Sequence, residues 1–178
     1  MNEELIIPED VSKWGIITAF FYFGVSLITY KYQYYLLSLL CFSVFITSIL
    51  HWHKQTISGI VKIIDMIFVI TLFIVFTFHY VHILFEDKYR KLWYVTAVLM
   101  VLAYIFNSII TYYQILNINN NDKYQTNYSY FSLEYTHPNT EARTMCYYTT
   151  TFVHLFFEHI LPCFVTSFMF ITSNPSVF

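Results

Sequence analysis

Four side chains that could take part in a reaction or bind a ligand lie near the connection between two apolar segments of the sequence. On a helix, Thr47, Ser48 and His51 share one face because they are three and four residues apart. His53 lies about 200° around the helix from His51 and points elsewhere. Asp65 lies a short way into the next apolar segment. Two hydroxyls, an imidazole and a carboxylate together could bind a metal ion or move a proton.

A second polar stripe occurs in the last apolar segment. Thr150, Thr151, His154 and Glu158 follow one face of the expected helix. Ionisable groups at membrane depth are costly, so they are candidates for a functional site by default. The stripe therefore predicts that the last helix contributes to the same kind of site as the second and third.

Three of these residues reach a similar depth. His51 is near the end of its segment, while Asp65 lies roughly 8 Å and His154 about 13 Å into theirs, at 1.5 Å per residue. Neutral imidazoles and one carboxylate are the usual ligands of a catalytic zinc ion. We therefore hypothesise a zinc site held by His51, Asp65 and His154. Ser48 would orient water or stabilise an oxyanion, and Glu158 would accept a proton or act as an extra ligand.

Pro162 lies inside the last segment and should distort it. Proline has no N–H, so it should free the carbonyl of Glu158 from its helical bond and kink the helix. A bilayer tolerates this only if a neighbour satisfies that carbonyl. His159 is about 140° around an α-helix from His154, so it could join the site only if the kink distorts this turn.

The composition of the chain indicates the environment of these residues. Of its 178 residues, 57% are hydrophobic and only 11% are charged, whereas a soluble domain averages about 25% charged residues. Such a chain could not cover a water-facing surface with polar groups. We therefore predict an all-α fold, a polytopic transmembrane helical bundle that forms one integral membrane domain over residues 1–178.

Five segments are at or near the ~20 residues that a helix needs to cross the hydrocarbon core. The expected spans are 14–30, 34–52, 60–85, 92–116 and 145–172. The "KYQ" between the first two is so short that they must form an antiparallel hairpin, and "EDKYRK" is expected to form a turn after the third. A polar loop is expected over 117–144, with one glycosylation pattern at Asn127.

The aromatic and basic residues give partial information on placement. Trp14, Trp52 and Trp93 lie at span ends, where amphipathic rings favour the membrane interface. With five spans, the N-terminus and the second and fourth connections share one side, here called side A. The basic residues do not decide which side is cytoplasmic. Side A carries Lys13, Lys54, Lys62, Lys123 and Arg143, and side B carries Lys31, Lys88, Arg90 and Lys91.

Membrane lipids are the expected partners. The net charge of −2 and the lack of a basic patch indicate no nucleic-acid partner. No cleavable signal peptide is expected, because "MNEELIIPEDVSK" is acidic where a signal would be basic. The organelle and any protein partners do not follow from the sequence.

The polar residues also have a structural explanation. Asp65 follows Lys62 by three positions, so the two could form an interfacial ion pair. His154 and Glu158 are four residues apart and could bond to each other, holding the last helix against its neighbours. Under this interpretation the side chains serve packing and no catalysis occurs.

The polar motifs resemble a superfamily of seven-span membrane hydrolases that includes alkaline ceramidases, adiponectin/progestin-type receptors and haemolysin III-like proteins. "SILHWH" with Ser48 and His51 is similar to the motif of their second helix, and "VKIIDMIFV" with Asp65 is similar to that of the third. His154 in "FVHLFFEHI" would stand for one of two histidines in the last helix. The resemblance implies that these residues hold zinc and that the protein hydrolyses lipid amides.

The chain departs from the family pattern in three ways. The family's Ser and His are usually four residues apart, whereas Ser48 and His51 are three apart and Thr47 is four from His51. The family's terminal pair is His-x-x-x-His, whereas Glu158 occupies the second position here and His159 comes one place late. Five expected spans replace seven, which still brings the last helix in from side A.

Two function classes therefore stay open. The chain is either a zinc-dependent intramembrane hydrolase of lipid amides or esters, or a non-enzymatic structural or accessory membrane protein. A transporter or channel has less support, because no ionisable stripe runs through the membrane and no selectivity-filter pattern is present.

Overall fold

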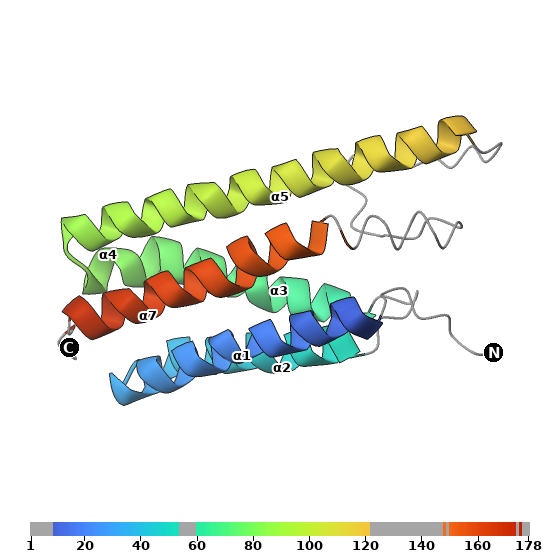
Figure 1. Cartoon of the computed structure of the whole chain (residues 1–178). Helices are drawn as coiled ribbons and strands as arrows, with labels where there is room; N and C mark the ends of the chain where they lie inside the picture. Colours follow the sequence, from blue (N-terminus) through green and yellow to red (C-terminus); the bar gives the residue numbers. More distant parts are fainter. Residues whose placement is uncertain (1–8, 54–59, 122–147, 149, 174, 176–178) are drawn as a thin grey trace.

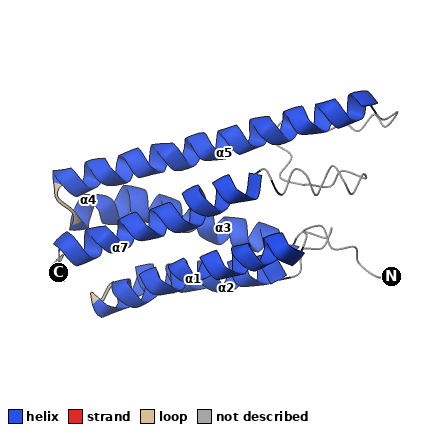
Figure 2. Cartoon of the chain, in the orientation of Figure 1, coloured by secondary structure: helices blue, strands red, loops and turns tan. Residues whose placement is uncertain are grey.

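The chain folds into a bundle of long helices, as the sequence predicted (Figures 1 and 2). The computed structural model describes residues 9–53, 60–121, 148, 150–173 and 175, with side chains placed outside 111–121. These residues form helices and turns, with no strand among them. The elements are α1 (Glu9–Lys31), α2 (Tyr35–His53), α3 (Ile60–Val75), the π-helical η1 (Phe76–Tyr80), α4 (Val81–Leu84), α5 (Asp87–Asn121), the π-helical η2 (Leu155–Ile160) and α7 (Leu161–Ser173).

Five helical stretches in the described part of the chain are long and apolar enough to cross a membrane, which identifies a multi-pass membrane protein. They are Glu9–Lys31, Tyr35–His53, Ile60–Leu84, Asp87–Ile110 and Thr150–Ser173. Many of their large apolar side chains point outward, especially along α3 and α5, where a soluble protein would carry polar groups.

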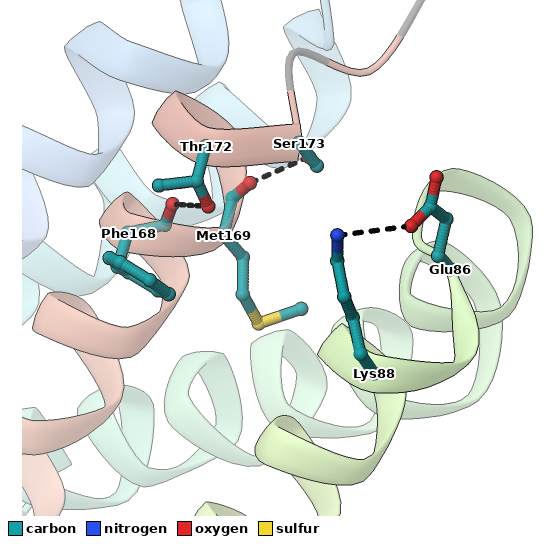
Figure 3. A network of polar contacts seen from close by, with 6 residues as sticks. All are labelled: Glu86, Lys88, Phe168, Met169, Thr172 and Ser173. Carbon is teal, nitrogen blue, oxygen red and sulfur yellow. Dashed lines mark hydrogen bonds and ion pairs between the residues drawn. The ribbon is translucent and has the colours of Figure 1, made fainter.

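Two helices begin earlier than expected. α1 begins at Glu9 and α5 at Asp87, each five residues before the expected span. An acid in the first turn is favourable at the positive end of the helix dipole, and Glu9 and Asp87 each pair with a lysine one turn later, at 3.3 and 2.7 Å. The expected "EDKYRK" turn is thereby reduced to Phe85 and Glu86. Figure 3 shows this end of the bundle, where Lys88 pairs with Glu86 and the hydroxyls of Thr172 and Ser173 bond to carbonyls of their own helix.

α5 also continues further than expected. It has 35 residues and ends at Asn121, which corresponds to roughly 52 Å at 1.5 Å per residue. The loop expected from 117 therefore begins later. The rest of that loop, with the Asn127 pattern, lies outside the described residues.

The expected α1–α2 hairpin is present. The N–H of Tyr34 bonds to the carbonyl of Thr29 at 3.0 Å, and Gln33 has a φ of 65°. These are the features of a helix C-terminus closed by a left-handed residue. Ser26 and Ser38 then bond across the two helices, each hydroxyl reaching the other residue's carbonyl at 2.9 Å.

The core lies between these helices and the last span. α7 lies between α5 and the α1–α2 pair (Figure 1), and it packs against α1 and α5. Of the three tryptophans, Trp14 is exposed, whereas Trp52 and Trp93 are buried against other helices. Their expected position at the membrane interface stays a prediction. The indole N–H of Trp93 donates to the hydroxyl of Thr77 at 3.0 Å.

Candidate functional site

The first part of the site joins α2 to α3. Thr47 and Ser48 both donate hydrogen bonds to Oδ1 of Asp65, at 2.7 and 2.9 Å. All three side chains are buried. A carboxylate at this depth is costly without donors, and the two hydroxyls offset part of that cost. Thr47 and Ser48, which the helical spacing places on one face, thus share one partner, Asp65.

The second part is the turn that precedes Pro162. The chain forms the π-helical η2 there, and the hydroxyl of Tyr22 on α1 donates to the carbonyl of Glu158 at 2.5 Å. This is the carbonyl that the proline leaves without its α-helical donor. The sequence-based prediction that a neighbouring group must satisfy it is confirmed.

The π-helical turn changes the position of His159. In a π-helix the bonded residues are five apart, so residues i and i+5 come close to the same face. The rings of His154 and His159 have centroids 5.1 Å apart. His159 is buried, and its Nδ1 lies 3.1 Å from the hydroxyl of Thr18. The distortion that His159 needed to join the site is therefore present.

Trp52 lies at the centre of the histidines. Its ring centroid is 5.9 Å from that of His154, 6.3 Å from that of His159 and 5.4 Å from that of His51. The indole is only 5% exposed. Gly15 makes room for it, because a Cβ there would lie 2.0 Å from Cδ2 of Trp52.

The predicted site residues are brought together only in part. Asp65 lies against α2 at Thr47 and Ser48, and the rings of His51 and His154 both contact the indole of Trp52. Among the His, Cys, Asp and Glu residues that the structure describes, however, no group of three converges closely enough to hold a metal ion.

Glu158 is half-buried, and its Oε1 is buried with no hydrogen-bond partner in the described part of the chain. The expected bond from His154 therefore does not reach this oxygen. A buried carboxyl oxygen without a donor can accept a proton or a hydrogen bond from a ligand. This property keeps Glu158 among the candidate reactive groups.

An apolar cavity of about 50 Å³ lies closer to side B than the polar groups around Glu158 do. Tyr22 and Pro162 connect the cavity to these polar groups, since both residues line the cavity and both belong to the contact around Glu158. The remaining lining residues come from all five spans and are mainly apolar: Val25, Leu37, Cys41, Val69, Leu72, Phe73, Phe76, Trp93, Met100, Cys163 and Thr166.

Sequence reasoning missed the contribution of α1. Thr18 and Tyr22 contact the last span, and both belong to a stripe with Ser26 and Thr29 at intervals of three and four residues. All four are buried. A polar stripe on one face of an uncharged span is a signal that such a helix faces protein and not lipid.

No protein-family model, curated protein or solved structure matches this chain. The functional argument therefore depends on the site itself.

Proposed function

We propose that the chain is a zinc-dependent hydrolase of lipid amides or esters that acts within the membrane. The observation that carries this proposal is the pairing of His154 and His159 across the π-helical turn. Two imidazoles bound to one tetrahedral zinc ion, each with a Zn–N distance of 2.0–2.1 Å, have ring centroids roughly 5 Å apart. The observed separation is 5.1 Å.

Two further residues are the candidates to complete the ligand set. Zinc binding would have to draw them closer to the histidine pair, because no three such ligands converge among the described residues. The ring of His51 contacts the indole of Trp52, against which His154 and His159 also pack. Asp65 accepts both hydroxyl bonds at Oδ1, and its Oδ2 would be the oxygen that binds the metal. Three imidazoles and one carboxylate are donors that suit zinc. Zinc bound there would lower the pKa of a coordinated water and supply hydroxide near neutral pH.

The surrounding side chains would orient the reacting groups. The contact of Thr18 with Nδ1 of His159 holds that ring and leaves Nε2 to bind a ligand, as is usual for histidines at metal sites. Ser48 donates its proton to Asp65, so its oxygen lone pairs can orient a water molecule. Glu158, with its unpaired Oε1, would take up and release the proton.

The substrate class follows from the surroundings of the site. The polar groups lie inside a helical bundle with an outward apolar surface, and the cavity beside them is apolar. A molecule that reaches them from the bilayer must itself be largely apolar. Lipid amides and esters satisfy this requirement and carry a bond that hydroxide can cleave.

One observation favours a second candidate, a non-enzymatic structural or accessory protein. The polar contacts join different helices: Thr47 and Ser48 join α2 to α3, and Thr18 and Tyr22 join α1 to η2. Polar contacts between helices stabilise membrane proteins without any catalytic role. Under this alternative the same variants would lose stability but no activity.

The metal content of the purified protein separates the two candidates. We expect about one zinc ion per chain by inductively coupled plasma mass spectrometry of the full-length protein in detergent. His154→Ala and His159→Ala should each lower this content strongly. His82→Ala is the matched control, because His82 is exposed and bonds to Tyr94 away from the site. A wild-type protein that contains no metal, unfolds cooperatively and takes up no added zinc would overturn the proposal.

Hydrolysis then tests the role of the acid. We expect release of oleate from an oleoyl amide or ester in mixed micelles, and a decrease of about 10²–10⁴-fold in Glu158→Gln, the usual contribution of a general acid–base. Retention of zinc by this variant would show that the loss does not come from the ligands. An unchanged rate would remove Glu158 from the reaction.

A further inference from the structure

Asn107 is a buried polar residue on the inward face of α5. This face also carries Trp93, Met100 and Ala103, which are buried at steps of seven, three and four residues. Trp93 and Met100 line the apolar cavity. Asn107 continues the same face toward side A, about two helical turns beyond Met100.

The amide of Asn107 has one group bonded and one group unpaired. Its Nδ2 donates to the carbonyl of Thr150 at 3.1 Å, and this bond assigns the other atom as the oxygen. Among the residues that the structure describes, that oxygen, Oδ1, is buried without a hydrogen-bond partner, and Asn107 is 9% exposed. An amide oxygen within a membrane protein is costly to leave unpaired.

The position of Asn107 relates it to the histidines. Asn107 bonds to Thr150, which precedes His154 by one helical turn. Asn107 therefore lies closer to side A than the histidine pair does, at the level where a lipid headgroup would be. Glu158 Oε1, one turn deeper than His154, is likewise buried without a partner among the described residues. Both atoms are acceptors, so a ligand that donates a hydrogen bond could satisfy either of them.

We propose that Asn107 is a substrate-binding residue whose Oδ1 accepts a hydrogen bond from a hydroxyl in the headgroup of the bound lipid. This inference rests on the proposed function only in assuming that the ligand is a lipid. The apolar chain would extend toward the cavity, the reactive carbonyl would lie near the histidines, and the headgroup would lie beside Asn107. Asn107 would then distinguish hydroxylated lipids from lipids of the same size without a donor.

A matched pair of lipid ethers tests this inference without any hydrolysis. Ethylene glycol mono-oleyl ether carries a terminal hydroxyl, and oleyl propyl ether carries a methyl group in its place. Neither contains an amide or ester. Using isothermal titration of the full-length protein in mixed micelles, we expect the hydroxylated ether to bind about 3- to 10-fold more tightly, as one neutral hydrogen bond allows.

Variants of Asn107 locate the effect. Asn107→Leu should abolish the preference, whereas Asn107→Asp, which keeps an acceptor oxygen, should retain it. Ser108→Leu is the matched control, because the Ser108 hydroxyl bonds to the carbonyl of Tyr104 on its own helix. Equal binding of both ethers by the wild-type protein would overturn the inference, whether or not the variants fold. A clear preference in a protein without zinc or hydrolysis would support it and reject only the proposed catalysis.

Discussion

The hydroxyl of Tyr22 lies 2.5 Å from the carbonyl oxygen of Glu158 and replaces the backbone donor that Pro162 lacks. This contact joins α1 to the π-helical turn of the last span. The same turn brings His159 beside His154. This hydrogen bond therefore links the packing of the first helix to the geometry of the candidate site.

Removing this hydroxyl should destabilise the protein. We expect Tyr22→Phe to lower the free energy of unfolding by about 1–3 kcal/mol, because the Glu158 carbonyl is left without a donor. Thermal or denaturant unfolding in detergent measures the effect. Tyr30→Phe, at an exposed tyrosine of the same helix, should change stability by less than about 0.5 kcal/mol.

The link to proline can be tested by a double-mutant cycle. Pro162→Ala provides a backbone N–H for the Glu158 carbonyl, so Tyr22→Phe should cost less in that background. We expect a coupling energy of about 0.5–3 kcal/mol, the usual range for groups in contact. Additive effects of the two substitutions would show that the tyrosine does not compensate for the proline.

Alanine substitutions at the two glycines of α1 should have opposite effects on stability. Gly15→Ala should destabilise the protein by about 1–3 kcal/mol, because its Cβ would overlap the indole of Trp52. Displacing this ring should also disturb its contact with His154. Gly24→Ala meets nothing within 4 Å and should be neutral or stabilising by up to about 1 kcal/mol, since alanine favours helices. Unfolding and Trp fluorescence measure both effects, and equal behaviour of the two variants would contradict the predicted packing.

The spans could be predicted from the sequence because membrane helices have a strong and local signal. Runs of about 20 apolar residues with few charges can hardly form anything else in this chain. Helix ends were less predictable, because Glu9 and Asp87 extend their helices through local charge effects that hydrophobicity does not record.

The candidate site was predictable only where it depended on regular helices. The contact of Thr47 and Ser48 with Asp65 follows from α-helical spacing and a short connection. The pairing of His154 with His159 depends on a π-helical turn, and an α-helical projection placed these residues on different faces. Pro162 was the signal for that distortion, but the tyrosine that bonds to this turn, Tyr22, comes from a distant part of the chain.

The hydroxyl–carboxylate contact gives a fourth prediction. We expect Thr47→Val and Ser48→Ala each to destabilise the protein by about 1 kcal/mol, and the double variant by about 3–5 kcal/mol, because Asp65 then has no donor. Adding Asp65→Leu should restore much of the lost stability, since both partners are then apolar. Ser43→Ala is the control, because the exposed Ser43 hydroxyl bonds to the carbonyl of Leu39 on its own helix. A triple variant no more stable than the double variant would show that the carboxylate is not the source of the loss.

The last prediction concerns the π-helical turn itself. Such a turn is equivalent to one residue inserted into an α-helix, so deleting the partly exposed Phe156 should convert it to α-helix and keep His154 and His159 on one face, now four residues apart. We expect the unfolding temperature of the deletion variant to lie within a few degrees of that of Phe156→Ala. The deletion variant should also retain any bound zinc. Deleting the exposed Phe164 from the regular helix α7 should instead be severely destabilising, because it rotates the residues beyond it by about 100° and moves Met169 and Phe170 out of the core. Equal loss of stability in the two deletions would show that the turn is not an insertion that the fold accommodates.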